Sequence, residues 1–441
     1  MPVLAAPVLS AALLALPAAS GSPALAPRSP ALASLDALYP DLRALYVDLH
    51  QTPELSTHEE KTSAKLAERL KKLGYDVTDH VGGFGVVAVL ENGKGPTVLL
   101  RADMDALPVE ERTGLPYASK VTTKNDAGET VSVMHACGHD VHMTSLIGAA
   151  TLLEKARKRW RGTLVLIAQP AEEAGAGASA MLKDGLFTRF PRPDYAIALH
   201  DDFRLPAGKL GYTPGYLWAN IDSVDITIFG RGGHGASPQN TVDPVVIAAR
   251  TVLALQTIVS RENDPLDPAV VTVGSIHGGT RYNVIPDEVR LQLTVRSYKE
   301  EVRRRLLAAI ERIAKAEAAA AGAPKPPVVT AGEVPVQACF NDPALTKRMA
   351  AMLTAAFGAS NVVELPPAMA GEDFAEYVRA GVPGFYFRVG ATPAARFEAA
   401  HGDLTRLPAL HSSEFAPDPE PTLKTGVSAL TLTALDLLGK R

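Results

Sequence analysis

The sequence predicts an α/β protein in which a smaller α+β domain is inserted into a larger one. From Leu35 to about residue 211, helical patterns alternate with short aliphatic runs of the kind that fill a buried sheet. From residue 212 to residue 327, apolar and polar positions alternate in longer runs, and after a Pro-rich segment the first pattern returns. We therefore expect a larger domain formed by residues 35–211 and 328–441, with residues 212–327 inserted between its two parts.

The first long helix of the larger domain is expected from about Thr57 to Leu73. Ser56 and Glu59 have the spacing of a capping box, in which a serine hydroxyl and a glutamate carboxylate satisfy free amides of the first turn. The segment KTSAKLAERLKKL then repeats apolar residues at helical period until Gly74. The pattern therefore predicts both the start and the end of this helix.

Four short apolar runs are expected to form the main sheet: residues 85–90, 97–102, 163–168 and 195–199. Each run ends just before a cluster of polar residues. Ligands in open α/β sheets bind beyond the carboxyl ends of the strands, so these clusters are the candidates for a functional site.

The insertion is expected to contain two helices and alternating strands. Strands are predicted at residues 223–229, 270–276 and 289–298, and helices at 242–259 and 299–321. In the second part of the larger domain we expect a helix at 343–357 and a strand at 385–389. A unit with its own helices and sheet can build its own hydrophobic core.

Composition excludes several classes of protein. The chain has 441 residues, with 44 basic and 48 acidic side chains, and this near balance argues against an obligate nucleic-acid binder or a disordered tail. Its two cysteines, Cys137 and Cys339, exclude a disulfide-stapled scaffold, and Cys339 is interpreted as a small buried hydrophobic residue.

Residues 1–26 contain no charged side chain and resemble a signal peptide, which predicts a periplasmic or secreted protein. The protein would be cytoplasmic if this leader is not a signal. No later segment has the run of about 18 uninterrupted apolar residues that spans a bilayer, so no membrane association is expected after processing.

Polar clusters at the predicted strand ends carry the chemistry. In chain order they are RADMD (101–105), HACGHD (135–140), EE (172–173), HD (200–201), GED (371–373) and His411. Carboxylates, imidazoles and one thiolate together form a donor set for a divalent transition metal. Glu172 and Glu173 are neighbours that point in different directions, so one can bind a metal while the other transfers a proton. His142 could be a metal ligand, but we expect it on the first turn of a helix, where it satisfies a backbone or carboxylate partner. His50 is interpreted as structural.

Eight motifs taken in order resemble one known family. RADMDALPVEE, MHACGHDVHM, QPAEEAGAGA, ALH, GRGGHGASP, NVIPDEV, AGEDF and LHSSEF are similar to the co-catalytic metallopeptidase and aminoacylase family, in its amidohydrolase branch of hippurate, N-acyl-amino-acid and auxin-conjugate hydrolases. The resemblance runs from about Leu35 to the C-terminus. It implies an α/β/α catalytic domain with a mixed sheet of the zinc-exopeptidase type, and it implies that the insertion is a lid and dimerisation domain.

The resemblance also implies a role for individual residues. Cys137 would bridge two metal ions, with Glu173 and His411 completing one site and His139 and His200 the other. Glu172 would be the general base, and Asp105 would orient a ligand. His234 would reach the active site of a partner subunit and help to hold the oxyanion, while Asn283 and Arg296 would contact the substrate carboxylate. The set of residues implied by the resemblance is Cys137, His139, Glu173, His200, His411, Glu172, Asp105, His234, Asn283 and Arg296.

The expected reaction is hydrolysis of the amide bond of an N-acyl amino acid by a metal-activated water. Zinc suits the Cys/His/Glu donors best, and manganese, cobalt or nickel also fit them. Two alternatives stay open at this point. One is a dipeptidase or carboxypeptidase that acts on peptides, and the other is a non-catalytic receptor with the same fold. A serine hydrolase is excluded because no GxSxG occurs, and a dinucleotide site is disfavoured because residues 170–174 separate the strand from the glycines.

Overall fold

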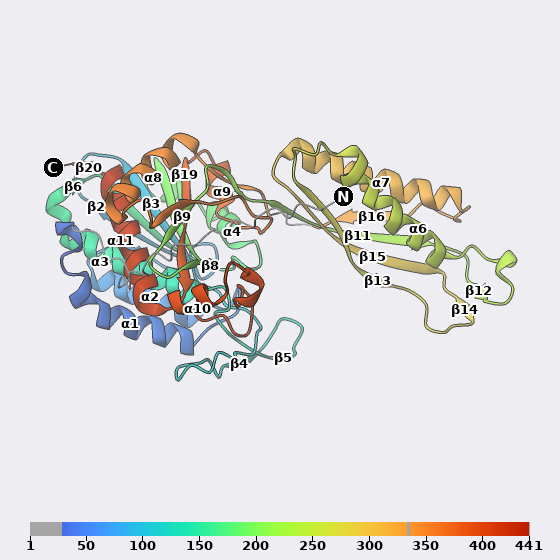
Figure 1. Ribbon diagram of the computed structural model, residues 1–441, viewed down its shortest axis with the longest axis horizontal. Coiled ribbons are helices and arrows are strands. Elements are labelled where there is room, and N and C mark those ends of the chain that lie inside the picture. Colours follow the sequence, from blue (N-terminus) through green and yellow to red (C-terminus); the bar gives the residue numbers. More distant parts are fainter. Residues whose placement is uncertain (1–28, 333–335, 441) are drawn as a thin grey trace, which may run out of the picture.

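The computed structural model describes residues 29–332 and 336–440, so the predicted signal peptide lies outside the described part of the chain. Figure 1 shows a larger domain on one side and the inserted domain beside it, joined by extended strands. We call the larger unit the catalytic domain, after the role that the family resemblance implies for it. We call the inserted unit the lid domain.

The catalytic domain contains an eight-stranded mixed sheet in the order β1-β2-β7-β3-β8-β19-β9-β18. Its four central strands β7, β3, β8 and β19 are parallel, so their carboxyl ends meet at one edge. The strand bounds are β1 Asp76–Thr78, β2 Val86–Glu91, β3 Thr97–Asp103, β7 Thr163–Gln169, β8 Tyr195–Pro206, β9 Leu210–Tyr212, β18 Val362–Glu364 and β19 Gly384–Thr392.

Both faces of this sheet are apolar because alternate residues of each strand enter different cores. On β3, Val98 and Leu100 belong to the larger core, whereas Leu99 belongs to the core of the opposite face. The larger core lies under α1 Leu35–Gln51, α2 Glu60–Lys72, α3 His139–Lys155, α8 Pro343–Phe357 and α11 Pro419–Leu437. The opposite face is covered by α4 Gly177–Lys183, α5 Leu186–Arg189 and α9 Ala375–Arg379.

The lid domain is built on a four-stranded antiparallel sheet in the order β13-β15-β11-β16, with its own core under two helices. The elements are β11 Asn220–Phe229, α6 Pro244–Thr257, β13 Ala269–His277, β15 Glu288–Ser297, α7 Glu300–Ala320 and β16 Val328–Ala331. The sheet continues to Ala331, past the predicted end at 327. At the other boundary β10 Gly215–Trp218, which the sequence assigned to the insertion, pairs with β17 Cys339–Asn341 against the catalytic domain.

Several short elements complete the described residues. β12 Gly233–His234 pairs with β14 Val284–Ile285, and Figure 1 places this pair at the end of the lid domain farthest from the catalytic domain. The other short elements are β4 Thr122–Lys124, β5 Thr130–Ser132, β6 Trp160–Arg161, β20 Gly439–Lys440, α10 Ala394–Ala399 and the 3₁₀ turns Pro30–Leu32, Arg157–Arg159, Pro238–Asn240 and Leu404–Arg406.

The α6 helix continues through a π-helical turn, Ile258–Glu262. Within the described residues, Pro244–Glu262 is the one helix long and apolar enough by length and composition to cross a membrane, and a third of its span is buried inside the protein. Its buried side packs on the lid sheet, as the apolar face of a helix in a folded domain does.

The capping prediction for α2 is wrong. The helix begins at Glu60 because Thr57 has a positive φ of 68°, which breaks the helical path. The Ser56 hydroxyl donates to Asp105 Oδ2 at 2.6 Å instead of capping the helix. A tertiary contact at the polar edge of the sheet therefore replaces the predicted local one.

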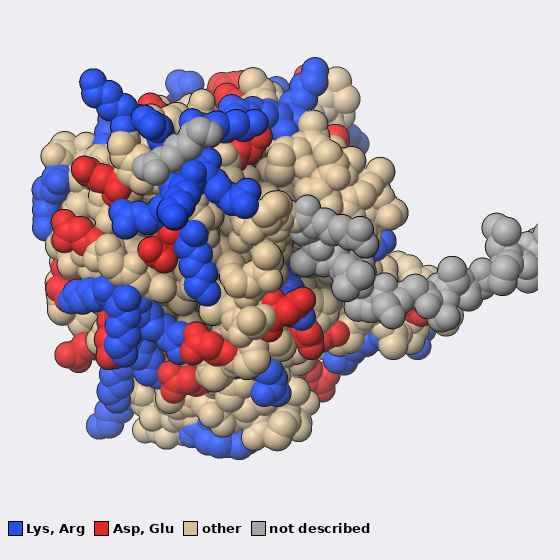
Figure 2. Space-filling view, turned by 90° about the vertical axis from the view of Figure 1, so that its left-hand side faces the viewer, with Lys and Arg blue, Asp and Glu red and all other residues tan. Residues whose placement is uncertain are grey.

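Figure 2 shows the end of the catalytic domain that lies opposite the lid domain. Basic and acidic side chains lie next to one another on parts of this face, mainly on the left and at the top of the view, and uncharged residues occupy the rest of the described surface. Such mixing is typical of a solvent-facing surface.

The α/β class with an inserted α+β unit, predicted from the sequence, is confirmed.

Candidate active site

A cavity of about 630 Å³ opens at the carboxyl edge of the central strands. The catalytic domain supplies most of its wall and the base of the lid domain supplies the rest. Six side chains of the wall were predicted as site residues: Cys137, Glu172, Glu173, His200, Arg296 and His411. Arg388 also lines the wall.

Cys137 and His139 are placed by the tight start of α3. Gly138, between them, has a φ of 77°, and a Cβ there would lie 2.1 Å from Asp201 Oδ2, so only glycine fits. His139 donates from Nδ1 to the backbone carbonyl of Asp105 at 2.7 Å. That hydrogen bond leaves Nε2 of the buried ring as a free electron-pair donor.

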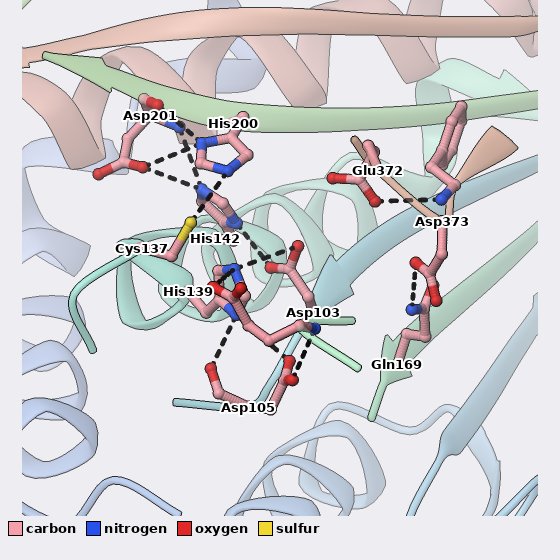
Figure 3. A network of polar contacts seen from close by, with 12 residues as sticks. Asp103, Asp105, Cys137, His139, His142, Gln169, His200, Asp201, Glu372 and Asp373 are labelled. Atoms are coloured by element: carbon pink, nitrogen blue, oxygen red, sulfur yellow. Dashed lines mark hydrogen bonds and ion pairs between the residues drawn. The ribbon is translucent and has the colours of Figure 1, made fainter. Parts of the chain in front are cut away.

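His200 is oriented in the same way on β8. Its Nδ1 donates to the backbone carbonyl of Asp201 at 2.7 Å, and its Nε2 lies 3.5 Å from Cys137 Sγ. Behind it, His142 lies between Asp103 at 2.6 Å and Asp201 at 3.3 Å, as Figure 3 shows. The predicted role of His142 as a partner of nearby carboxylates is confirmed.

Glu172 and Glu173 follow β7 after a strained residue. Ala171 has a φ of 51°, unusual for a residue with a Cβ, and its amide donates to the buried carboxylate of Glu59 at 2.8 Å. His411, whose φ is 67°, places Nε2 at 3.3 Å from Glu173 Oε1. Such backbone strain persists where surrounding contacts hold a functional geometry.

Several groups of donor atoms could hold a metal ion, and two of them share Cys137. One group is Cys137, His139 and His200, and the other is Cys137, Glu173 and His411, with all donor atoms of a group within 4.8 Å of one another. Two buried donors of these groups, His139 Nε2 and Glu173 Oε1, form no hydrogen bond with the described residues and make only ion-pair contacts, such as that of Glu173 with His411. Both groups therefore fit divalent metal ions, with the sulfur available to both.

The electrostatics of the cluster also fit bound cations. Burial, reinforced by Glu173 and Glu172, raises the pKa of the Cys137 thiol well above its usual value. Burial and the neighbouring carboxylates of Glu372 and Glu173 likewise raise the pKa of Glu172. Positive charge placed between these groups would favour the thiolate and the carboxylates.

A buried arginine holds the base of the site together. Arg101 on β3 donates to Asp103 at 2.6 Å, to Glu372 at 2.8 Å and to Asp373 at 3.0 Å. Gln169 also accepts from Arg101 Nε and donates to Asp373. Arg101 therefore connects the end of β3 with the loop that precedes α9.

The three predicted site residues of the lid domain, Arg296, His234 and Asn283, do not lie in one place. Arg296 lines the same cavity as Glu172 and His200. His234, on β12, and Asn283, next to β14, lie together at the far end of the lid domain, where Gly235 donates its amide to the Asn283 carbonyl. The structure therefore does not bring His234 or Asn283 to the cavity of their own chain.

Sequence reasoning missed four supporting residues of the site. Asp103 and Asp201 lie within the RADMD and HD clusters but were given no role, and Ser56 and Glu59 were read only as helix caps. Asp105 accepts from Ser56 and also from the backbone amide of Glu173 at 2.9 Å, so it helps to position the glutamate pair.

His50 forms a buried ion pair network beside the site. Its Nδ1 lies 2.7 Å from Asp140 and its Nε2 lies 3.1 Å from Glu111. Burial alone would lower the pKa of His50, but the hydrogen bonds to both carboxylates raise it from 6.5 to about 10. The imidazolium therefore stabilises the fold fully below pH 6.5, and this contribution is lost as the pH rises through about 10.

We expect the free energy of unfolding to fall between pH 7 and pH 10 in the wild type. The His50→Gln variant should lose about 3–5 kcal/mol near pH 7, because it leaves two buried carboxylates without a counter-charge. Its stability should also change less over this pH range. Urea denaturation at several pH values measures both effects, and parallel pH profiles of the two proteins would contradict the ionised pairing.

Comparison with known proteins identifies the family of this chain. Residues 99–409 match the peptidase family M20/M25/M40. The N-acetyl-L-cysteine deacetylase of Bacillus subtilis is 41% identical over 344 residues, which cover 77% of each chain. The hippurate hydrolase of Campylobacter jejuni is 43% identical over 260 residues, covering 58% of this chain and 64% of the relative.

A solved structure agrees with these matches. The structure of a dinuclear metal-binding M20 peptidase from Bacillus subtilis superposes with a TM-score of 0.74 at 30% identity, covering 91% of this chain and 100% of that one. The resemblance inferred from the eight motifs is thereby confirmed. The chain belongs to the peptidase family M20/M25/M40, in its branch of amidohydrolases.

Proposed function

We propose that this protein hydrolyses the amide bond of N-acyl amino acids with two divalent metal ions held by Cys137, His139, Glu173, His200 and His411. The observation that carries the proposal is the pair of donor groups that share Cys137, with Glu172 in the wall of the same cavity. The names of the two relatives, a deacetylase of N-acetyl-L-cysteine and a hippurate hydrolase, support an N-acyl amino acid as the substrate.

Two cations bound there would supply Lewis acidity, which lowers the pKa of the attacking water and polarises the amide carbonyl. Glu172 takes the proton from the attacking water and returns it to the leaving nitrogen. Arg296 binds the carboxylate of the substrate through its planar guanidinium. The products are a carboxylic acid and an amino acid.

The identity of the metal is proposed from its donors. One thiolate, three imidazoles and a carboxylate suit zinc, and manganese, cobalt and nickel accept the same set. We expect two ions for each chain.

The test is hydrolysis of a substrate panel by chelated protein to which zinc, manganese, cobalt or nickel is returned. The panel contains hippurate, N-acetyl-methionine, N-acetyl-aspartate, an indoleacetyl amino acid and two dipeptides. Metal-dependent turnover of the N-acyl amino acids supports the proposal. Turnover of the dipeptides alone would favour the peptidase, and no turnover with two bound ions would favour the receptor.

We also propose that the protein is a homodimer through the lid domain. Apolar side chains are exposed on the outer side of α6 and on β13, the edge strand of the lid sheet. The largest exposed fractions among them are Val246 55%, Leu253 73% and Ile276 55%. His234 is not among the residues that line the cavity, and β12 lies at the end of the lid domain farthest from the catalytic domain (Figure 1), which supports a role for His234 in the partner's site.

Subunit complementation tests this arrangement. His234→Ala and Glu172→Gln should each lower activity by about 10²-fold or more. After exchange of subunits, a mixed dimer has one complete site, so an equal mixture should regain up to about a quarter of wild-type activity. A mixture that stays inactive, although light scattering shows exchanged dimers, would contradict the role of His234.

Finally, we propose that the protein is exported to the periplasm or the medium. The uncharged residues 1–26 support this location. N-terminal sequencing of the protein from fractionated cells checks it, and an intact leader in the cytoplasmic fraction would contradict it.

A further inference from the structure

Arg388 is a buried arginine of the cavity wall to which neither the sequence analysis nor the proposed reaction gives a role. It lies on β19 and is only 1% exposed. In the parallel ladder with β8 it pairs with His200, so both side chains extend from the same face of the sheet. Its guanidinium also lies 5.5 Å from the centre of the Trp218 ring, and that ring lies 5.8 Å from the ring of His200.

The free edge of this guanidinium has the geometry that a carboxylate needs. Nε and Nη2 have no hydrogen-bond partner among the described residues. These two nitrogens form one edge of the planar group, and their parallel N–H bonds match the two oxygens of a carboxylate. Within the described part of the chain, the one ion pair of Arg388 is a long contact of Nη1 with Asp202 Oδ2, at 3.5 Å.

Among the described residues, the carboxylate that contacts Arg388 is already bound by another arginine. Asp202 already accepts from Arg204, at 2.9 Å from Nε and at 2.7 Å from Nη2. The other buried arginine of the sheet, Arg101, is surrounded by three carboxylates. Arg388 therefore differs from Arg101, because it is buried as a cation without a matching protein anion.

The charge of Arg388 is kept at neutral pH. Burial lowers the pKa of its guanidinium to about 10, which is still well above 7. Arg296 lines the same cavity, so two arginines face the substrate while Arg204 is neutralised by Asp202. An N-acyl amino acid with one carboxylate would balance only one of these two charges.

We propose that Arg388 binds a second carboxylate of the substrate through Nε and Nη2, so that the preferred substrates carry two carboxylates. This inference rests on the proposed function, because it adds a specificity determinant to the same site. The second carboxylate can come from an acidic amino acid, as in N-acetyl-glutamate, or from a dicarboxylic acyl group, as in N-succinyl-methionine. A cavity of about 630 Å³ has room for either compound.

The first experiment compares the wild type with Arg388→Met on matched substrates. We expect kcat/KM for N-acetyl-glutamate or for N-succinyl-methionine to fall by about 10- to 10³-fold, because a charged bidentate contact is lost. N-acetyl-glutamine and N-acetyl-methionine should change by less than about threefold. Arg388→Lys should restore only part of the loss, because an ammonium keeps the charge but lacks the planar edge.

Two outcomes would overturn the proposal. An equal loss on all four substrates would show that Arg388 serves the common α-carboxylate or only supports His200. No preference of the wild type for a dicarboxylate over its neutral counterpart would show that the free edge is not used.

A binding measurement separates this proposal from the proposed function. Calorimetry with the metal-loaded Glu172→Gln protein compares glutarate with butyrate, which lacks the second carboxylate. Tighter binding of glutarate that disappears in the Glu172→Gln/Arg388→Met double variant supports the carboxylate site even if no N-acyl amino acid is hydrolysed. Equal binding of the two acids would contradict it even if hydrolysis is observed.

Discussion

Glu172→Gln is expected to lower kcat by about 10²–10⁴-fold, because the amide cannot take a proton from water or return it to the leaving nitrogen. The side chain keeps its size, so the cavity wall and the neighbouring donors should stay in place. Steady-state kinetics on the best substrate of the panel measures the loss. Metal analysis of the same sample should still find the two ions of the wild type.

The adjacent residue supplies the matched control. Glu173→Gln makes the same chemical change one position along the chain, but Glu173 belongs to a donor group with Cys137 and His411. We expect this variant to bind less metal and to recover part of its activity when excess metal is added. Full metal-dependent activity of Glu172→Gln would refute its assignment as the general base. Equal metal loss in both variants would show that the two glutamates do not divide the work.

Arg101→Met is expected to lower the free energy of unfolding by about 3–5 kcal/mol, because the change leaves a buried carboxylate cluster without its cation. Arg101 contacts Asp103, Glu372 and Asp373, and its side chain is 0% exposed. Urea denaturation of the purified variant measures the effect.

Arg69→Met is the control for this stability measurement. Arg69 forms an ion pair of similar length with Asp41, at 2.8 Å, but both side chains are open to solvent. Removing such a surface pair should cost about 0–1 kcal/mol. A similar loss in the two variants would show that burial does not determine the importance of Arg101.

The sheet was predictable because its strands are continuous apolar runs. Residues 163–168, for example, enter both cores of the catalytic domain, so almost every position must be apolar. The start of α2 was not predictable, because the Ser56 hydroxyl is used by Asp105, which lies far along the chain. A local motif cannot reveal which of two partners a side chain selects when one of them is brought in by tertiary structure.

The donors of the site were predictable for a different reason. Cys137, Glu173 and His411 lie in motifs whose residue types are unusual next to buried strands, and the family resemblance links them across the chain. Arg388 carried no such signal, because a single arginine in FYFRVG reads as an ordinary strand residue. Arg388 is notable because it lacks a well-matched carboxylate partner. Only the structure shows this, because it places Arg204 against Asp202, the carboxylate that Arg388 contacts.

The insertion of the lid domain between β8 and β19 also sets an order of events during synthesis. The two strands are neighbours in the sheet, but the ribosome completes the whole lid domain before β19 exists. The lid domain, whose strands are close in sequence, can fold while β8 still has an unpaired edge. His411 emerges later still, so the nascent chain cannot assemble both donor groups until its synthesis is almost complete.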